Sequence, residues 1–316
     1  MSRSPDLGRL PVVALPASHD SSATIYVALA ANAVIALAKG FAAWFTGSTS
    51  MLAEAVHSLA DCGNQGLLLL GLLRSTRPAD SEHPLGYGRE IYFWSFIVAV
   101  MLFSMGGMFS VYEGIHKLAG NAPLKDPWVA IAVLLLSLTA ESISLWKCLI
   151  QVNAARGAQS LWRWFRETRQ SELLVILGED IAATLGLGLA LLAVAVAMAS
   201  GNPFYDALGS IVIGVLLLIV AIGVGVETKA LLVGQSAEPA LRREIRRFLG
   251  GRGEVAEVLN LITLQHGAYV VVAIKARMAE RESAPRMIAA INDCERSLHA
   301  VFPQVQWIFF EPDVAA

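Results

Sequence analysis

The stretch EAVHSLADCGNQ, residues 54–65, places ionisable and amide side chains inside a long apolar segment. His57 and Asp61 are four residues apart and therefore share one face of a helix, and Asn64 lies near that face. Ionisable groups at membrane depth are costly, and they usually face the interior of a helix bundle or a water-filled path. An imidazole and a carboxylate one turn apart form half of a tetrahedral zinc site. The alternative is a buried hydrogen bond between His57 and Asp61 that only joins helices.

Composition indicates that lipid surrounds part of this chain. Of its 316 residues, 55% are hydrophobic and 16% are charged, whereas soluble globular proteins carry about a quarter charged residues. The formal net charge of −2 argues against nucleic-acid binding, which requires a basic surface. Cys62, Cys148 and Cys294 include no C-x-x-C pair, so neither a disulfide framework nor a thiolate zinc site is predicted.

Six apolar stretches are long enough to cross a membrane, since a helical span needs about 20 mainly apolar residues. They are Thr24–Phe45, Ser50–Leu73, Glu90–Leu118, Trp128–Val152, Leu173–Ala199 and Phe204–Leu232. We therefore expect an α-helical membrane protein with a six-helix transport domain over residues 21–235. Residues 1–20 are interrupted by Pro11 and Pro16 and are expected to form a cytoplasmic tail, because they lack the apolar core of a signal peptide.

The distribution of basic residues predicts the orientation, because Lys and Arg favour the cytoplasmic side. Two of the loops between spans carry seven arginines, namely Arg74, Arg77 and Arg89 after the second span and Arg156, Arg163, Arg166 and Arg169 after the fourth. Only the loop after the third span disagrees, with Lys117 and Lys125. Both termini are therefore expected in the cytoplasm. A bacterial inner membrane is the expected location, because the N-terminus lacks the pattern of a transit peptide.

Residues 236–316 have the composition of a small soluble domain. The expected elements are a helix over Pro239–Leu249, a hairpin of Val258–Gln265 and Ala268–Met278, a helix over Pro285–Phe302 and a strand over Val305–Phe310. This order predicts an αββαβ, ferredoxin-like α+β domain in which the helices cover one face of the sheet. His266 in the turn and His299 on the last helix are expected to be solvated.

The fifth apolar stretch contains two adjacent carboxylates, Glu179 and Asp180. Adjacent helical residues point about 100° apart, so Glu179 and Asp180 cannot both point directly at one ion. Asp180 shares a face with Thr184, and the longer side chain of Glu179 would have to extend around the helix to reach the same ion. Like charges side by side at low dielectric repel each other, which makes the pair hard to explain as core. For Glu179 we weigh a ligand equally against a supporting or proton-carrying role, or a salt bridge to Lys39. Glu141 in the fourth stretch is expected mainly to bond helices together, in a polar stripe with its neighbouring serines.

Two motifs resemble the cation diffusion facilitator family. Residues 39–61, KGFAAWFTGSTSMLAEAVHSLAD, resemble its helix-one to helix-two signature, and residues 77–88, RPADSEHPLGYG, resemble its next loop. The resemblance implies a homodimeric, proton-coupled exporter of a divalent metal, usually zinc, with a tetrahedral site between helices two and five. It implies that His57, Asp61 and Asp180 are ligands.

The resemblance is incomplete at three places. Ile176 stands where the family usually has a histidine ligand, and Glu179, or water, is expected to take its place, as in a divergent branch with Glu-Asp in helix five. Asp80 and His83 match two ligands of a second, cytoplasm-facing site, but Tyr87 stands at the third position. Two ligands make a weak site, and an ordinary interfacial loop is the preferred interpretation. The C-terminal domain lacks the family's histidine ligands and is expected to join the dimer by packing alone.

The function expected from these features is proton-coupled efflux of Zn²⁺ from the cytoplasm, with Fe²⁺, Co²⁺, Ni²⁺ and Mn²⁺ as further candidates. Metal and protons compete for the same imidazole and carboxylate atoms, which gives a direct route to antiport. No resident cofactor and no enzymatic activity are expected, because the chain has no H-E-x-x-H motif of a metallohydrolase. The alternative is a membrane-embedded metal sensor or scaffold without transport.

Overall fold

The computed structural model describes residues 29, 33–34, 36–37, 40–41, 44, 49–120, 127–279 and 283–315. The described residues form two compact units that divide after Val233. The first unit is helical and the second contains the sheet.

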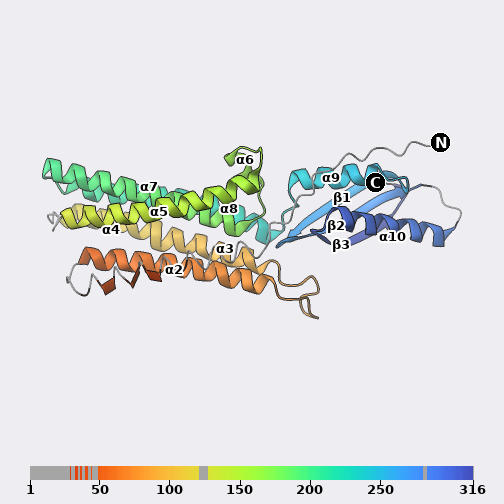
Figure 1. Cartoon of the computed structure of the whole chain (residues 1–316), viewed down its shortest axis with the longest axis horizontal. Helices are drawn as coiled ribbons and strands as arrows, with labels where there is room; N and C mark the ends of the chain where they lie inside the picture. The colour runs from red at the N-terminus through yellow and green to blue at the C-terminus, as the bar shows by residue number, and fades with distance from the viewer. Residues whose placement is uncertain are drawn as a thin grey trace. The chain divides into compact units, whose positions relative to one another are not determined.

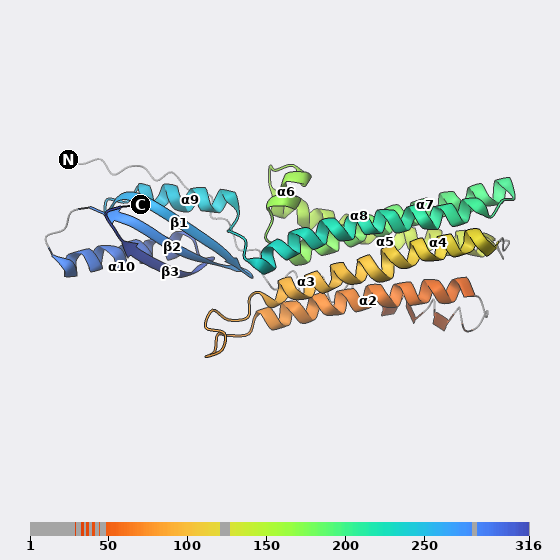
Figure 2. The same ribbon diagram turned by 180° about the vertical axis from the view of Figure 1, so that it is seen from behind.

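The helical unit consists of long helices that run side by side, as the two opposite views show (Figures 1 and 2). The elements are α2 (Thr49–Ser75), α3 (Glu90–Met101), η1 (Leu102–Met108), α4 (Phe109–Gly120), α5 (Pro127–Arg156), α6 (Leu161–Glu167), α7 (Ser171–Ser200) and α8 (Phe204–Val233). Four described segments are long and apolar enough to cross a membrane: Glu90–Leu118, Ile131–Arg156, Ser171–Ser200 and Phe204–Val233. These segments confirm a helical membrane protein with at least four candidate spans.

The two remaining predicted spans are not among these four segments. Of the 22 residues of the first, Thr24–Phe45, eight are described and each of them is helical, while the other residues lie outside the described part. The second corresponds to α2, a single helix of 27 residues, and the polar residues of its N-terminal half keep it out of the four apolar segments. Helix α6, on the loop between the fourth and fifth predicted spans, was not predicted. Its N-cap Ser160 accepts a hydrogen bond from the backbone N–H of Arg163, which favours a helix start.

The third predicted span is not one regular α-helix. A π-helical segment, η1, lies between α3 and α4, and Gly106 and Gly107 lie in its C-terminal half. A Cβ atom at Gly107 would come within 2.6 Å of the Leu218 side chain, so glycine permits close packing of η1 on α8. Glycine also weakens the regular helix, and these two effects explain why a π-helical turn is accommodated here.

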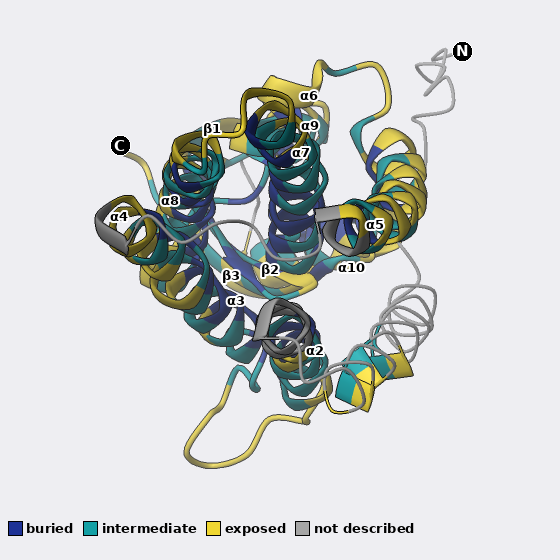
Figure 3. Cartoon of the chain, turned by 90° about the vertical axis from the view of Figure 1, so that its left-hand side faces the viewer, coloured by how far each residue is buried: buried dark blue, intermediate teal, exposed yellow. Residues whose placement is uncertain are grey.

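The burial pattern of the helical unit separates an inner from an outer surface. Viewed end-on, the buried faces of α3, α7 and α8 point toward the interior of the bundle (Figure 3). Large apolar side chains such as Leu136, Trp146 and Ile219 remain exposed on the outside. In a soluble protein such extensive apolar exposure would promote association, whereas lipid solvates it without cost.

The C-terminal unit is a three-stranded sheet with two helices. Its elements are α9 (Pro239–Gly250), β1 (Val255–His266), β2 (Tyr269–Met278), α10 (Ala284–Val301) and β3 (Val305–Pro312). The strand order is β1-β2-β3, with β1 antiparallel and β3 parallel to β2. Ile245 and Leu249 of α9 and Cys294 and Leu298 of α10 join one core with Val272 of β2. Both helices therefore cover the same face of the sheet.

The prediction that His266 is solvated is wrong, whereas His299 is exposed as expected. Only 6% of the His266 surface is exposed, and its ring packs edge-on against Trp307 of β3 at a centroid distance of 5.5 Å. The residue does end the first strand of the hairpin, paired with Tyr269. The third strand covers His266, and the sequence of the turn does not show that this strand packs there.

Candidate metal centre

Helix α7 carries two buried carboxylates in an otherwise apolar segment. Glu179 is 9% exposed and Asp180 is 5% exposed. Gly178 precedes them, and a Cβ atom at this position would come within 2.7 Å of Val224 on α8. The glycine thus lets α8 pack closely on α7, while the two carboxylates turn toward the remaining helices.

The first contact of this pair comes from α2. Asn64, only 4% exposed, donates a hydrogen bond from its Nδ2 to Glu179 Oε1 at 3.1 Å. This contact joins the second and fifth predicted spans across 115 residues of sequence. A neutral amide holds one oxygen of Glu179 in place without neutralising the carboxylate.

The second contact comes from α5. The Ser144 hydroxyl lies 3.3 Å from Asp180 Oδ1 and 3.2 Å from Oδ2, and it can donate to either oxygen. Glu141, one turn earlier on α5, acts electrostatically on both Glu179 and Asp180. The polar stripe predicted on this helix therefore joins α5 to α7, and it does so at the carboxylates of α7.

The local electrostatics are negative. Among the described residues, the charged side chains that act on Glu179 and Asp180 are carboxylates, with Asp61 of α2 acting on both. No lysine or arginine of the described residues forms an ion pair with either one. Buried charges are stable only when they are paired or coordinated to a metal, so this arrangement favours a cation or bound protons.

Three buried oxygen atoms near this level of the bundle accept or donate no hydrogen bond within the described structure. They are Asn64 Oδ1, Gln65 Oε1 and Thr184 Oγ1. Asn64 and Gln65 follow Asp61 on α2, and Thr184 lies one turn after Asp180 on α7. Buried polar atoms normally have partners, so these oxygens suit a hydrated ion that supplies the missing contacts.

The structure brings some of the predicted ligands together but does not test the complete set. Asp61, Glu179 and Asp180 lie within electrostatic range of one another. Among the residues whose side chains are described, no three His, Cys, Asp or Glu groups are arranged to hold a metal ion. His57 belongs to α2, but its side chain is outside the described part. The sequence signal for Asn64 was its place near the His57–Asp61 face, and its bond to Glu179 was not predicted.

An apolar layer separates these carboxylates from the arginine-bearing loops. Leu68 lies one turn after Asn64 on α2, and Leu174 lies before Glu179 on α7. Both are almost fully buried and pack in one cluster with Val98, Val175 and Val224. An ion that moves between the carboxylates and those loops therefore requires this layer to open.

In the loop after α2, both oxygens of the Asp80 carboxylate already accept hydrogen bonds. One oxygen accepts hydrogen bonds from the backbone N–H groups of Glu82 and His83, and the other accepts the Tyr87 hydroxyl at 2.7 Å. These hydrogen bonds, that of Tyr87 most of all, hold the pKa of Asp80 below its ordinary value. The His83 Nδ1 lies 3.6 Å from Asp80, and its ring packs on Tyr87. The contacts have the character of an ordered turn.

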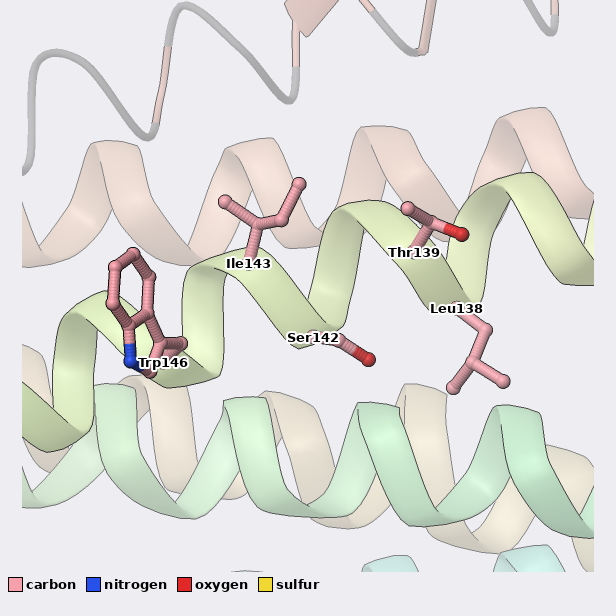
Figure 4. A pocket seen from close by; sticks show the side chains of 5 residues that line it. All are labelled: Leu138, Thr139, Ser142, Ile143 and Trp146. Carbon is pink, nitrogen blue, oxygen red and sulfur yellow. The ribbon is translucent and has the colours of Figure 1, made fainter.

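A separate hollow of about 490 Å³ lies along α5. Its lining residues are Leu138, Thr139, Ser142, Ile143 and Trp146 (Figure 4). All five come from one helix and none is ionisable, whereas Glu141 and Ser144 face the α7 carboxylates. Among the described residues, the lining of this hollow includes none of the groups that contact Glu179 and Asp180.

The comparisons with known proteins agree on one protein family. The profile described as the cation efflux transmembrane domain matches residues 25–233. A mitochondrial proton-coupled zinc antiporter of Homo sapiens is 37% identical over 229 residues, which cover 71% of this chain and 40% of that protein. A metal tolerance protein of Arabidopsis thaliana is 32% identical over 66% of this chain and 46% of its own length. The cation-efflux pump FieF of Escherichia coli is 26% identical over 87% of both chains.

The chain thus matches about 40% of the length of the mitochondrial antiporters, and the matched region contains α2, α5 and α7, which carry the buried carboxylates. The profile covers well over half of the sequence. This chain belongs to the cation efflux family, the cation diffusion facilitators, which is a family of membrane transporters.

Proposed function

We propose that this chain exports a divalent cation, zinc above all, in exchange for protons. The observation that carries the proposal is the pair Glu179 and Asp180, buried in the membrane helix α7 and held by the neutral donors Asn64 and Ser144. Relatives that are named a proton-coupled zinc antiporter and a cation-efflux pump support the same function.

The proposed ligands are His57, Asp61, Asp180 and Glu179. Glu179 replaces the histidine that Ile176 cannot supply. Asn64 binds one oxygen of Glu179, which leaves the other oxygen for the metal. Imidazole and carboxylate ligands in tetrahedral geometry suit zinc, and Fe²⁺, Co²⁺, Ni²⁺ and Mn²⁺ are weaker candidates.

Exchange follows from competition between protons and metal for the same atoms. Binding requires neutral imidazole and ionised carboxylates, so a higher pH favours the metal-bound site and a lower pH releases the ion. The apolar layer around Leu68 and Leu174 opens when the site faces the arginine-bearing loops, and it closes when the site faces the other side. Rocking of helices around a fixed site accomplishes such alternation in many transporters.

The decisive test is zinc flux into proteoliposomes, measured with and without a pH step. Antiport predicts that collapse of the pH gradient strongly slows concentrative uptake. Equal rates would overturn antiport. Zinc binding without any flux would instead support the alternative function, a membrane-embedded sensor or scaffold.

A substitution of His57 tests the selectivity between metal ions. All-oxygen sites admit hard cations such as Mn²⁺ more readily than sites that contain imidazole. His57→Asp should therefore increase manganese flux relative to zinc flux, measured for both ions in the same vesicles. An unaltered ratio would remove His57 from the ligand set.

The finer architecture is also part of the proposal. Residues 24–45 and α2 provide two more spans, which gives six spans in residues 21–235, a cytoplasmic tail in residues 1–20, and a ferredoxin-like αββαβ domain in residues 236–316. The arginines of the loops around α6 and between α2 and α3 support a cytoplasmic location of both termini. The proposed membrane is the inner cell membrane. Protease protection of terminal tags in oriented vesicles tests this topology, and opposite protection of the two termini would exclude six spans.

The C-terminal sheet is the proposed homodimer contact. The face that α9 and α10 leave uncovered presents Ile262 and Phe309, which are 59% and 57% exposed. A hollow of about 400 Å³ lies beside them. Phe309→Glu should convert the full chain from dimer to monomer in detergent, as measured by light scattering, while Glu257→Gln at the other end of β1 should not. A dimer that persists in the Phe309 variant would exclude this face.

For the loop after α2, the proposed role is structural. Asp80 and His83 would form a two-ligand site at most, and the hydrogen bonds to both oxygens of Asp80 favour an ordered interfacial turn. The positive φ of Gly86, 79°, belongs to the same turn, and glycine adopts this conformation most readily.

A further inference from the structure

Helix α9 has two opposite faces with different chemistry. Ile245 and Leu249 are fully buried in the core of the C-terminal unit, and Leu241 and Phe248 pack beside them. The opposite face carries four exposed arginines, Arg242, Arg243, Arg246 and Arg247. Their spacing of i, i+1, i+4 and i+5 gathers the guanidinium groups on one side of the helix. Glu244 is the one acidic residue within α9.

These four arginines, the α9 arginine face, differ from other basic residues of the same unit. Lys275 lies 2.8 Å from Asp313, Arg277 lies 3.0 Å from Glu257, and Arg252 lies 3.0 Å from Glu254. Within the described residues, none of the four arginines of α9 forms an ion pair. Lys275, Arg277 and Arg252 are thus matched within the unit, whereas the α9 arginine face lacks an anionic partner within the described chain.

A short linker joins α9 to the last candidate span. Helix α8, the last candidate span, ends at Val233, and α9 begins at Pro239. Five residues separate the two helices, and an extended linker of that length spans about 20 Å. The linker therefore keeps the first residue of α9 within about 20 Å of the last residue of this candidate span.

We infer that the α9 arginine face binds anionic phospholipid headgroups at the membrane surface. Guanidinium groups bind phosphate oxygens with paired hydrogen bonds, and a basic cluster next to a membrane span is attracted to anionic lipid. The apolar face of α9 is already used in the domain core, so the contact is electrostatic and α9 does not insert into the bilayer. This contact holds the C-terminal unit at the membrane, independently of the cation that is transported.

The contact is measured on the full-length chain in nanodiscs. One sample contains phosphatidylcholine alone, and the other contains about 30% phosphatidylglycerol, a fraction that gives a strongly negative surface. Phenylglyoxal modifies accessible arginines, and mass spectrometry gives the rate at each residue. Phosphatidylglycerol should slow modification of the α9 arginine face about five-fold. Arg286 and Arg296 on α10 serve as internal controls and should react equally in both samples.

Two further conditions, added salt and added inorganic phosphate, complete this experiment. Salt at about 1 M shortens the screening length to about 3 Å and should remove the protection. Inorganic phosphate added to phosphatidylcholine nanodiscs should give none. Equal rates on α9 in the two lipid mixtures, or equal protection by inorganic phosphate, would overturn the assignment to lipid.

A variant series provides the second measurement. Native mass spectrometry in neutral detergent gives the affinity for short-chain phosphatidylglycerol. The quadruple change R242Q/R243Q/R246Q/R247Q should weaken binding more than ten-fold, because each basic residue contributes about five-fold. The corresponding quadruple lysine variant should retain most of the affinity, and R286Q/R296Q should not change it. Wild-type affinity in the glutamine variant, with its circular dichroism unchanged, would contradict the inference.

Discussion

The carboxylates of the two units are stabilised in different ways. In the C-terminal unit, Asp313 and Glu257 lie 2.8 and 3.0 Å from the cationic groups of Lys275 and Arg277. In the helical unit, Glu179 and Asp180 are buried, and their hydrogen-bond donors among the described residues are the neutral side chains of Asn64 and Ser144. The exposed carboxylates have built-in counterions, whereas the buried pair does not.

This difference separates structural charges from functional ones. A carboxylate with a fixed cationic partner has little to gain from a metal ion, because the metal would have to displace that partner. A buried carboxylate with neutral donors keeps its charge available, at the cost of an uncompensated site in low dielectric. The comparison predicts large functional effects at α7 and small, local effects at the exposed carboxylates.

The largest effect is expected at Asp180. Asp180→Asn preserves the shape of the side chain but removes its charge, and zinc flux in proteoliposomes should fall at least about 100-fold. The matched control is Asp206→Asn on α8, because Asp206 already pairs with Lys117 at 3.3 Å and exposed ion pairs contribute little. Comparable flux in the two variants would erase the distinction between the two kinds of carboxylate.

Asn64 should have the next largest effect. Asn64→Ala removes the donor at 3.1 Å from Glu179, and loss of a group that orients a metal ligand costs about 10–100-fold in affinity. The half-saturating zinc concentration should rise while the maximal flux falls less. Asn153→Ala is the control, because this exposed amide contacts Arg156 on the same side of α5. An unchanged half-saturating concentration would show that Glu179 needs no positioning.

A smaller effect is expected at Asp313, outside the membrane. The hydrogen bond from Lys275, with help from two backbone N–H groups, lowers the pKa of Asp313 from 3.8 to about 2. A lowered pKa in the folded state stabilises the ionised form, so this contribution is present above pH 4 and is lost as the pH falls toward 2. Asp313→Asn should remove it.

Hydrogen exchange of β2 and β3 amides in the full chain provides the measurement. The variant should exchange faster than the wild type at pH 5, and the difference should shrink near pH 2. A difference that is independent of pH would show that the Lys275 contact acts by packing alone.

The smallest effect on function is expected in the loop after α2. Tyr87→Phe removes the hydroxyl that donates to Asp80 at 2.7 Å, so the pKa of Asp80 should rise toward its ordinary value of 3.8. Carbon-detected NMR of the carboxyl group measures this change. Zinc flux should stay near wild type in Asp80→Asn, and a large loss of flux would favour a second metal site over a structural turn.

The sequence predicts the elements of this protein well where local patterns are strong. The long apolar runs correspond to α5, α7 and α8, because burial in lipid demands such runs irrespective of tertiary packing. The C-terminal elements follow from turn residues and periodicity. The sequence contains the four arginines of α9, but only the structure shows that none of them forms an ion pair with another described residue.

Other features depend on neighbours that a local pattern does not contain. Gly107 of the π-helical segment is approached closely by Leu218, more than 100 residues away. His266 is buried because Trp307, on the third strand, covers it. Likewise, the spacing of His57 and Asp61 indicates a shared face but does not say which residue of α7 meets α2.

The sequence alone determined that carboxylates lie inside membrane-length helices, since their positions in apolar runs allow no other placement. Only the tertiary structure decided that Asn64 binds Glu179 and that Ser144 binds Asp180. The reason is geometric: helical period fixes the face on which a side chain lies, whereas the rotation and packing of neighbouring helices fix which faces meet.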